Sequence, residues 1–234
     1  STPDYAIVWT KVPSIPQGGT QVCVYYGNPS ASSASDGSST FLFFDDFNGT
    51  LNKWNTMGGN AFSISQGSLV MSGKDSSINN LRTTASFDQR IAVEYRLKRD
   101  GSLYVVGVTH GITSNKPSVG HVSLSPYVSS VGRSYDGWSG TYIAPGRSLS
   151  SSSTDGTPIG DGSSGVWQRI SIQERDSSIR AVKDGVSYDY SGQITGSGPL
   201  NVFYYSHLAN ANVNVDFIAV RKYVTNEPGH GEWE

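Results

Sequence analysis

The chain has 234 residues, with 17 lysines and arginines against 19 aspartates and glutamates, so its formal net charge is −2. This near balance gives no electrostatic reason to expect nucleic acid or an acidic lipid surface as a partner. No run approaches the roughly 18 apolar residues of a membrane-spanning helix, so no membrane span is expected. The length allows one large β-domain, alone or with a fragment of another.

The first forty residues predict a β-hairpin followed by a spacer. Apolar and polar side chains alternate, as is typical of strands, through residues 5–12 and again through residues 20–26, and a Pro- and Gly-rich turn separates the two. The second strand contains Cys23, the only cysteine, which we expect to be a small buried apolar side chain. Residues 28–39, rich in Ser, Ala and Gly, predict a spacer.

A second β-domain is predicted to begin with the run FLFF at residues 41–44, which reads as a strand buried on both faces. The domain should close with residues 212–223, NVNVDFIAVRKY, where apolar residues alternate cleanly. The termini of a compact domain often lie close together, so we expect these first and last strands to pair.

That pairing predicts a cation site. It would bring Asp216 close to the turn that carries Asp45, Asp46 and Asn48. Carboxylate and amide oxygens are the ligands that Ca²⁺ prefers, so we predict a structural calcium ion there. The alternative is that Asp46 and Asn48 only close the turn through bonds from side chain to backbone. The four histidines have no close-spaced partners, so a zinc site is not supported.

Short strands separated by turn residues fill the region between these two ends, and no segment has a sustained helical period. This pattern predicts an all-β, antiparallel two-sheet sandwich. The strongest hairpin signal is the step Asp184-Gly185. The expected strands are residues 62–64, 68–72, 90–98, 103–109, 121–126, 167–175, 179–183, 186–190 and 200–207.

Two motif sets resemble known families. The sequence W-x-K-V-P from Trp9, then Y-Y-G-N from Tyr25, then F-x-F-F-D-D-F from Phe41, is similar to the closing portion of the prokaryotic family DUF2341. The later W-x-x-I-x-I from Trp167, with a strand ending at Asp184-Gly185, resembles concanavalin A-like (LamG-type) jelly rolls. The resemblance implies three parts: residues 1–40 as the end of a DUF2341-like segment, 41–223 as a jelly roll, and 224–234 as a tail.

The same resemblance implies a piece of a larger secreted or cell-surface protein. The low share of charged residues, 15%, agrees with this expectation, as does the glycosylation sequon at Asn48.

The region from residue 129 to 165 is too long for an ordinary connection, and such loops are often functional. Tyr135, Trp138 and Tyr142 interleave there with Gly and Ser, and Tyr127 precedes them. Sugars stack their apolar faces on aromatic side chains while polar groups fix their orientation. We therefore predict a noncatalytic carbohydrate-binding or adhesion module whose partner is a polysaccharide or cell-surface glycan.

Two other functions remain open: a polysaccharide-degrading enzyme, either a hydrolase or a lyase, and a structural subunit. A polysaccharide hydrolase needs two carboxylates close together, but Glu94 and Glu174 are the only glutamates within the fold, and the motif E-x-D-x-x-E is missing. A polysaccharide lyase would need Glu94 and Arg96 to share one groove with Tyr205 and residues such as His110. The other function is a structural subunit that assembles with other copies, or with other domains of its parent protein, by adding its N-terminal strands to a sheet.

Overall fold

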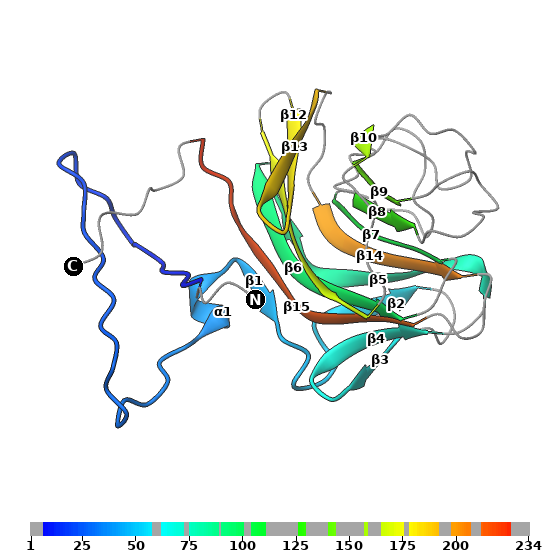
Figure 1. Cartoon of the computed structure of the whole chain (residues 1–234), viewed down its shortest axis with the longest axis horizontal. Coiled ribbons are helices and arrows are strands. Elements are labelled where there is room, and N and C mark those ends of the chain that lie inside the picture. Colours follow the sequence, from blue (N-terminus) through cyan, green and yellow to red (C-terminus); the bar gives the residue numbers. More distant parts are fainter. Residues whose placement is uncertain are drawn as a thin grey trace.

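The computed structural model describes residues 7–57, 62–72, 75–88, 90–100, 104–110, 126–129, 140–143, 157–158, 165–175, 178–191, 198–206 and 212–225. Two antiparallel sheets form a sandwich, and the N-terminal segment extends away from it on one side (Figure 1). The fold class predicted from the sequence is confirmed. No helix among the described residues is long and apolar enough to cross a membrane.

The first sheet, sheet A, contains the beginning and the end of the sandwich. Its strands, in spatial order, are β13 (Val186–Ser191), β12 (Ser178–Lys183), β11 (Trp167–Glu174), β6 (Ile91–Asp100), β15 (Asn212–Lys222), β4 (Ser68–Ser72) and β3 (Phe62–Ser65), and β1 (Phe43–Asp45) also pairs with β15. Phe43 lies opposite Val220 and Asp45 opposite Ile218. The predicted pairing of the first and last strands is therefore correct.

The second sheet, sheet B, packs against the first. Its strands, in spatial order, are β10 (Thr157–Pro158), β9 (Gly140–Ile143), β8 (Pro126–Ser129), β7 (Tyr104–His110), β14 (Gly198–Ser206), β5 (Asp75–Phe87) and β2 (Trp54–Met57). The longest strand of the described chain, β5, was not predicted from the sequence. Its composition is mostly polar, so the alternation that marks a half-buried strand is hidden.

The core lies between the sheets. Sheet A contributes Val93 and Leu97, and sheet B contributes Leu81 and Val202, each at most 2% exposed. Burying a side chain of this size stabilises the fold by roughly 1.5–3 kcal/mol. Alternate residues of each strand point to opposite faces, so the intervening residues lie on the outer faces of the two sheets.

The turn after β1 is fixed by Asp45. Its carboxylate accepts a hydrogen bond from the Phe47 backbone N–H at 2.9 Å and another from the Trp54 indole N–H at 2.7 Å. Phe47 is fully buried with a positive φ of 54°, which few residues other than glycine adopt. Asp45 therefore ties the first strand of sheet A to the first strand of sheet B.

The predicted N-terminal hairpin is wrong. Residues 7–36, all of them described, contain no strand, and a one-turn helix, α1 (Gly37–Thr40), leads into β1. Tyr25 is 93% exposed, and Cys23 is exposed rather than buried. An isolated hairpin is at best marginally stable in water, and within the described chain no strand pairs with residues 7–12 or 20–26.

One residue of the N-terminal segment is anchored to the sandwich. The Trp9 ring lies 5.1 Å from the Arg221 guanidinium and 5.7 Å from that of Arg169, both on the outer face of sheet A. It also makes an edge contact with Phe41 at 5.8 Å. This docking holds the start of the described chain against the jelly roll.

Candidate functional site

The candidate site is a cluster of amide side chains on the outer face of sheet B. Because Leu81 and Leu200 point into the core, the next residues along their strands, Asn80, Arg82 and Asn201, lie on the opposite face. The sheet register places Asn201 directly opposite Arg82. Strands β5 and β14 thus bring together residues about 120 positions apart in the sequence.

The cluster is held by its own hydrogen bonds. Asn201 Oδ1 accepts from Asn80 Nδ2 and from Arg82 Nε, both at 3.0 Å. Asn80 and Asn201 are fully buried, although they face away from the core. Asn80 Oδ1 has no hydrogen-bond partner within the part of the chain that the structure describes. A buried acceptor left without a donor costs about 1–3 kcal/mol, so a donor that reached this oxygen would be bound favourably.

The register extends this cluster into a line across the sheet. Met57 lies opposite Asn80, Asn80 opposite Phe203, and Phe203 opposite Gly107. The pairing of β7 with β8 continues the line towards Tyr127, which lies directly opposite Tyr142.

Two of the four predicted sugar-binding positions, Tyr127 and Tyr142, are therefore in sheet B and adjacent to each other. The other two, Tyr135 and Trp138, lie outside the described residues, and all four assignments stay predictions. The amide cluster itself was missed by sequence reasoning, because Asn80 and Arg82 belong to the strand that went unrecognised.

Three of the four predicted calcium ligands come together as expected. Asp46, Asn48 and Asp216 line one groove of about 530 Å³ on the outer face of sheet A, beside Trp9. Asp46 Oδ1 also accepts from the Asn48 N–H at 3.3 Å, and hydrogen bonding from Asn48 lowers the pKa of Asp46. This bond is the one expected if Asp46 and Asn48 close the turn instead of binding a cation. Asp216 Oδ2 lies 3.1 Å from an Arg96 nitrogen, a cation already beside it.

The fourth, Asp45, uses its oxygens for Phe47 and Trp54 instead. Within the described residues there is no group of three or more His, Cys, Asp or Glu side chains that could hold a metal ion. Since Ca²⁺ takes six to eight oxygens, backbone carbonyls and water would have to complete the shell around Asp46, Asn48 and Asp216. Calcium binding stays a prediction.

The two glutamates of the fold lie apart. Glu94 is on the outer face of sheet A, 2% exposed, and accepts from Ser171 Oγ at 2.9 Å and from Arg221 Nε at 3.1 Å. Glu174 is fully buried, and its Oε1 lies 2.8 Å from His110 Nδ1. The two carboxylates therefore serve separate structural contacts.

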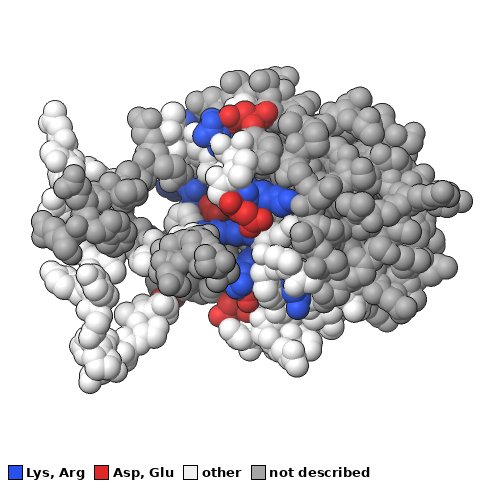
Figure 2. Space-filling view, in the orientation of Figure 1, with Lys and Arg blue, Asp and Glu red and all other residues white. Residues whose placement is uncertain are grey.

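The residues proposed for a lyase groove are also divided. Glu94 and Arg96 belong to β6 of sheet A, Tyr205 belongs to β14 of sheet B, and His110 is buried. On the side of the molecule in view, positive and negative side chains are interleaved (Figure 2). Arg96 itself is paired with Asp216. These residues do not form one polar groove.

Comparison with known proteins gives a family match at the N-terminus. The family "Domain of unknown function (DUF2341)" matches residues 1–57. This match runs past the Ser-rich spacer and includes β1 and β2, which pair with β15 and β5. The last part of the matched segment is therefore built into the sandwich. No curated protein matches the chain in sequence.

Solved structures define the class of fold as a concanavalin-like jelly roll. An endo-β-1,3-glucanase from Pyrococcus furiosus superposes with a TM-score of 0.59 at 15% identity, covering 80% of this chain and 95% of that one. The β-glucanase of Bacillus licheniformis gives 0.55 at 13% identity, with coverage of 77% and 97%. The carbohydrate recognition domain of Emp47p gives 0.54 at 16% identity, with coverage of 77% and 94%. The resemblance to a DUF2341 segment followed by a jelly roll is thus confirmed.

Proposed function

We propose that this chain is a noncatalytic carbohydrate-binding module that holds a glycan on the outer face of sheet B. The observation that carries the proposal is Asn80, whose buried Oδ1 has no donor among the described residues while its Nδ2 is fixed by Asn201. A sugar hydroxyl is a donor of the right kind, and a small number of such oriented polar groups is typical of ligand sites. The glucanases and the carbohydrate recognition domain that share the fold support the choice of ligand class.

The noncatalytic part of the proposal rests on the small number of acidic side chains in sheet B. Within their described bounds the strands of sheet B carry one acidic residue, Asp75. Glycosidases of the usual kind place two carboxyl groups roughly 5–10 Å apart across the scissile bond. Sheet B therefore supplies surface for binding and no strand-borne carboxylate pair for hydrolysis. The proposal places this module in a secreted or surface protein, where polysaccharides are available as partners.

The test is a glycan array followed by calorimetry with the best ligand. Asn80→Leu removes the unpaired oxygen, keeps the branching of the side chain and leaves Asn201 Oδ1 its bond from Arg82, so we expect little change in melting temperature and affinity at least about tenfold weaker. Asn212→Leu makes the same change on the outer face of sheet A and should bind like the wild type. Trp138→Ala should weaken binding without loss of stability. Wild-type affinity in Asn80→Leu would refute this site.

A second candidate function is assembly through the N-terminal segment. Val22 and Val24 are each more than half exposed, and Tyr25 and Tyr26 are more exposed still, in a stretch with a strand-like pattern. Such a segment is suited to pairing with the edge of a sheet in another copy or another domain. Sedimentation velocity should then show concentration-dependent assembly that disappears when residues 1–28 are deleted. A monomer at all concentrations would exclude it.

A further inference from the structure

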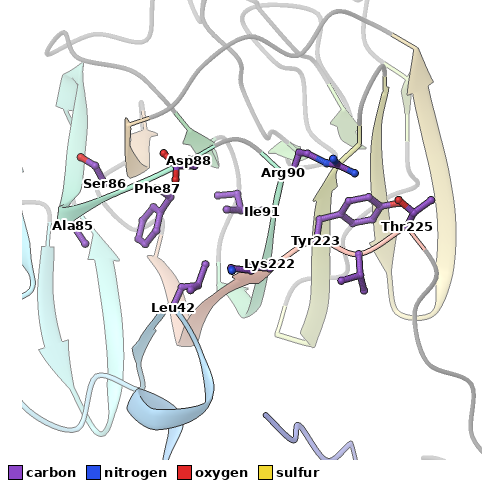
Figure 3. Close-up of a pocket in the computed structure, with 11 residues that line it drawn as sticks. Leu42, Ala85, Ser86, Phe87, Asp88, Arg90, Ile91, Lys222, Tyr223 and Thr225 are labelled. Carbon is purple, nitrogen blue, oxygen red and sulfur yellow. The ribbon is translucent and has the colours of Figure 1, made fainter. Parts of the chain in front are cut away.

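A second hollow, distinct from the amide cluster, lies at one end of the sandwich. It has a volume of about 740 Å³, within the roughly 300–1,000 Å³ of small-ligand sites. Three segments meet there: the end of β5 with the turn into β6, the exit of β15, and Leu42 just before β1 (Figure 3). Leu42 N–H donates to Val220 O and Tyr223 N–H donates to Arg90 O, both at 2.8 Å, so the walls are tied to one another.

The turn between β5 and β6, which forms one wall, makes hydrogen bonds with two buried side chains, Glu174 and His110. Glu174 Oε2 accepts from the backbone N–H groups of Arg90 at 2.9 Å and Ile91 at 3.3 Å. His110 contacts the same carboxylate through Nδ1 and the carbonyl oxygen of Phe87 through Nε2, at 3.1 Å. Both ionisable side chains are completely buried. One pair therefore fixes the chain on both sides of the turn.

Arg90 itself is strained. Its φ is +66°, in the left-handed region, which costs a residue with a side chain about 1–2 kcal/mol. Burying an ionisable pair also has a desolvation cost. Both costs fall on the same turn, and the hydrogen bonds to Glu174 offset them and fix the Arg90 backbone at the edge of the groove. Strain of this kind collects at ligand sites, where it fixes a side chain before the ligand arrives.

The groove has the chemistry of an anion site with an apolar floor. Phe87, Ile91 and Tyr223 form the buried part, and Arg90 and Lys222 are exposed on the walls. A single carboxylate, Asp88, accompanies these two cations among the lining residues. The groove is thus positive on balance in a protein whose net charge is −2. Exposed hydroxyls come from Ser86 and Thr225 in the same lining.

We propose that this groove binds an oligosaccharide of uronic acids. A guanidinium binds a carboxylate in a two-pronged geometry that a neutral sugar cannot use. The half-exposed side chains of Leu42 and Val224 offer contacts to the C–H face of a sugar ring, and the hydroxyls suit its polar edge. An extended acidic peptide fits less well, because the wall N–H groups of Leu42, Arg90 and Tyr223 are already hydrogen-bonded within the fold.

The experiment is calorimetry with trimers of galacturonate, glucuronate and mannuronate, each beside its methyl ester. We expect one of the three acids to bind, and its methyl ester, which lacks the negative charges and carries an added methyl group on each carboxyl, to bind at least about tenfold more weakly. Added salt should weaken binding of the acid and leave binding of the ester unchanged. A tri-glutamate peptide tests the other occupant, and peptide binding as tight as that of the sugar would overturn the proposal.

The informative variant is Arg90→Gly. Glycine accepts the left-handed backbone without strain and keeps the N–H that donates to Glu174, so the melting temperature should hold while affinity falls at least about tenfold. Lys222→Gln should weaken binding more modestly. Arg96→Gln removes one positive charge from the outer face of sheet A and is the matched control with wild-type affinity. No binding by any of the three acids, or equal binding by Arg90→Gly, would refute the site. The Asn80→Leu variant should bind the trimer normally, which separates this test from that of sheet B.

Discussion

The buried pair of Glu174 and His110 should be among the most costly contacts to break. The variant His110→Leu leaves the Glu174 carboxylate buried, with only the N–H groups of Arg90 and Ile91 beside it. Removing one partner of a buried ion pair costs about 3–5 kcal/mol. For a chain of this size each kcal/mol lowers the melting temperature by about 2–4 °C, so a fall of roughly 6–20 °C is expected.

An exposed pair provides the control. Arg180 donates to both carboxylate oxygens of Asp189 at 2.8 Å, the same separation as in the buried pair. Because both side chains are substantially exposed, Arg180→Gln should cost only about 0–1 kcal/mol. Urea unfolding at equilibrium measures both variants. The double variant of Glu174 and His110 should lose less than the sum of the singles by more than about 0.5 kcal/mol. A loss in His110→Leu no greater than that in Arg180→Gln would refute the reasoning.

Three further predictions follow from other contacts. If calcium binds beside Asp216, EDTA should lower the melting temperature, because calcium at a hundredfold excess over its Kd stabilises the fold by about 2.7 kcal/mol. Asp216→Ala should abolish this effect of EDTA. Identical melting temperatures with EDTA and with excess calcium would exclude the site. Hydrogen bonding from Arg180 lowers the pKa of Asp189. The pair therefore stabilises the fold fully above the unfolded pKa of about 3.9, and the advantage over Asp189→Asn should shrink as acid unfolding is followed below it. Trp9→Ala should cost about 1–2 kcal/mol and speed proteolysis of residues 7–36, because the ring contacts two guanidinium groups; unchanged proteolysis would contradict the docking.

Local signals predicted much of the sandwich. The turn at Asp184-Gly185 has positive φ at both residues, 49° and 87°, as its sequence indicated. The alternation in β15 was correct up to Val215, but a bulge between Val215 and Phe217 shifts its phase, so that Ile218 and Val220 lie in the core and the predicted inward position of Phe217 is wrong. The predicted pairing of β15 with β1 was correct. These elements follow from turn chemistry and from a period of two, which need no knowledge of neighbouring strands.

Other elements depend on contacts that alternation cannot show. In β5, Thr83 lies in the core and exchanges hydrogen bonds with the Leu200 backbone, so a polar residue occupies an inward position. Residues 20–26 have the pattern of a strand, but within the part of the chain that the structure describes they pair with no other strand. The amide cluster joins Asn80 to Asn201, and only the register of β14 on β5 reveals it. The fold class was therefore predictable, whereas the candidate site was not.

The central position of β15 also governs when the protein can fold. Among the described strands, β1, β4 and β6 pair with it, yet it is the last of them to be synthesised. Phe43 can pair with Val220 only after Val220 has been synthesised. At about 5–20 residues per second, synthesis of the intervening chain takes roughly 10–35 s. During that interval the run from Phe41 to Phe44 has no sheet to join and is an aggregation hazard. Completion of sheet A thus waits until β15 has been synthesised, and a chaperone that covers these phenylalanines should raise the yield of folded protein.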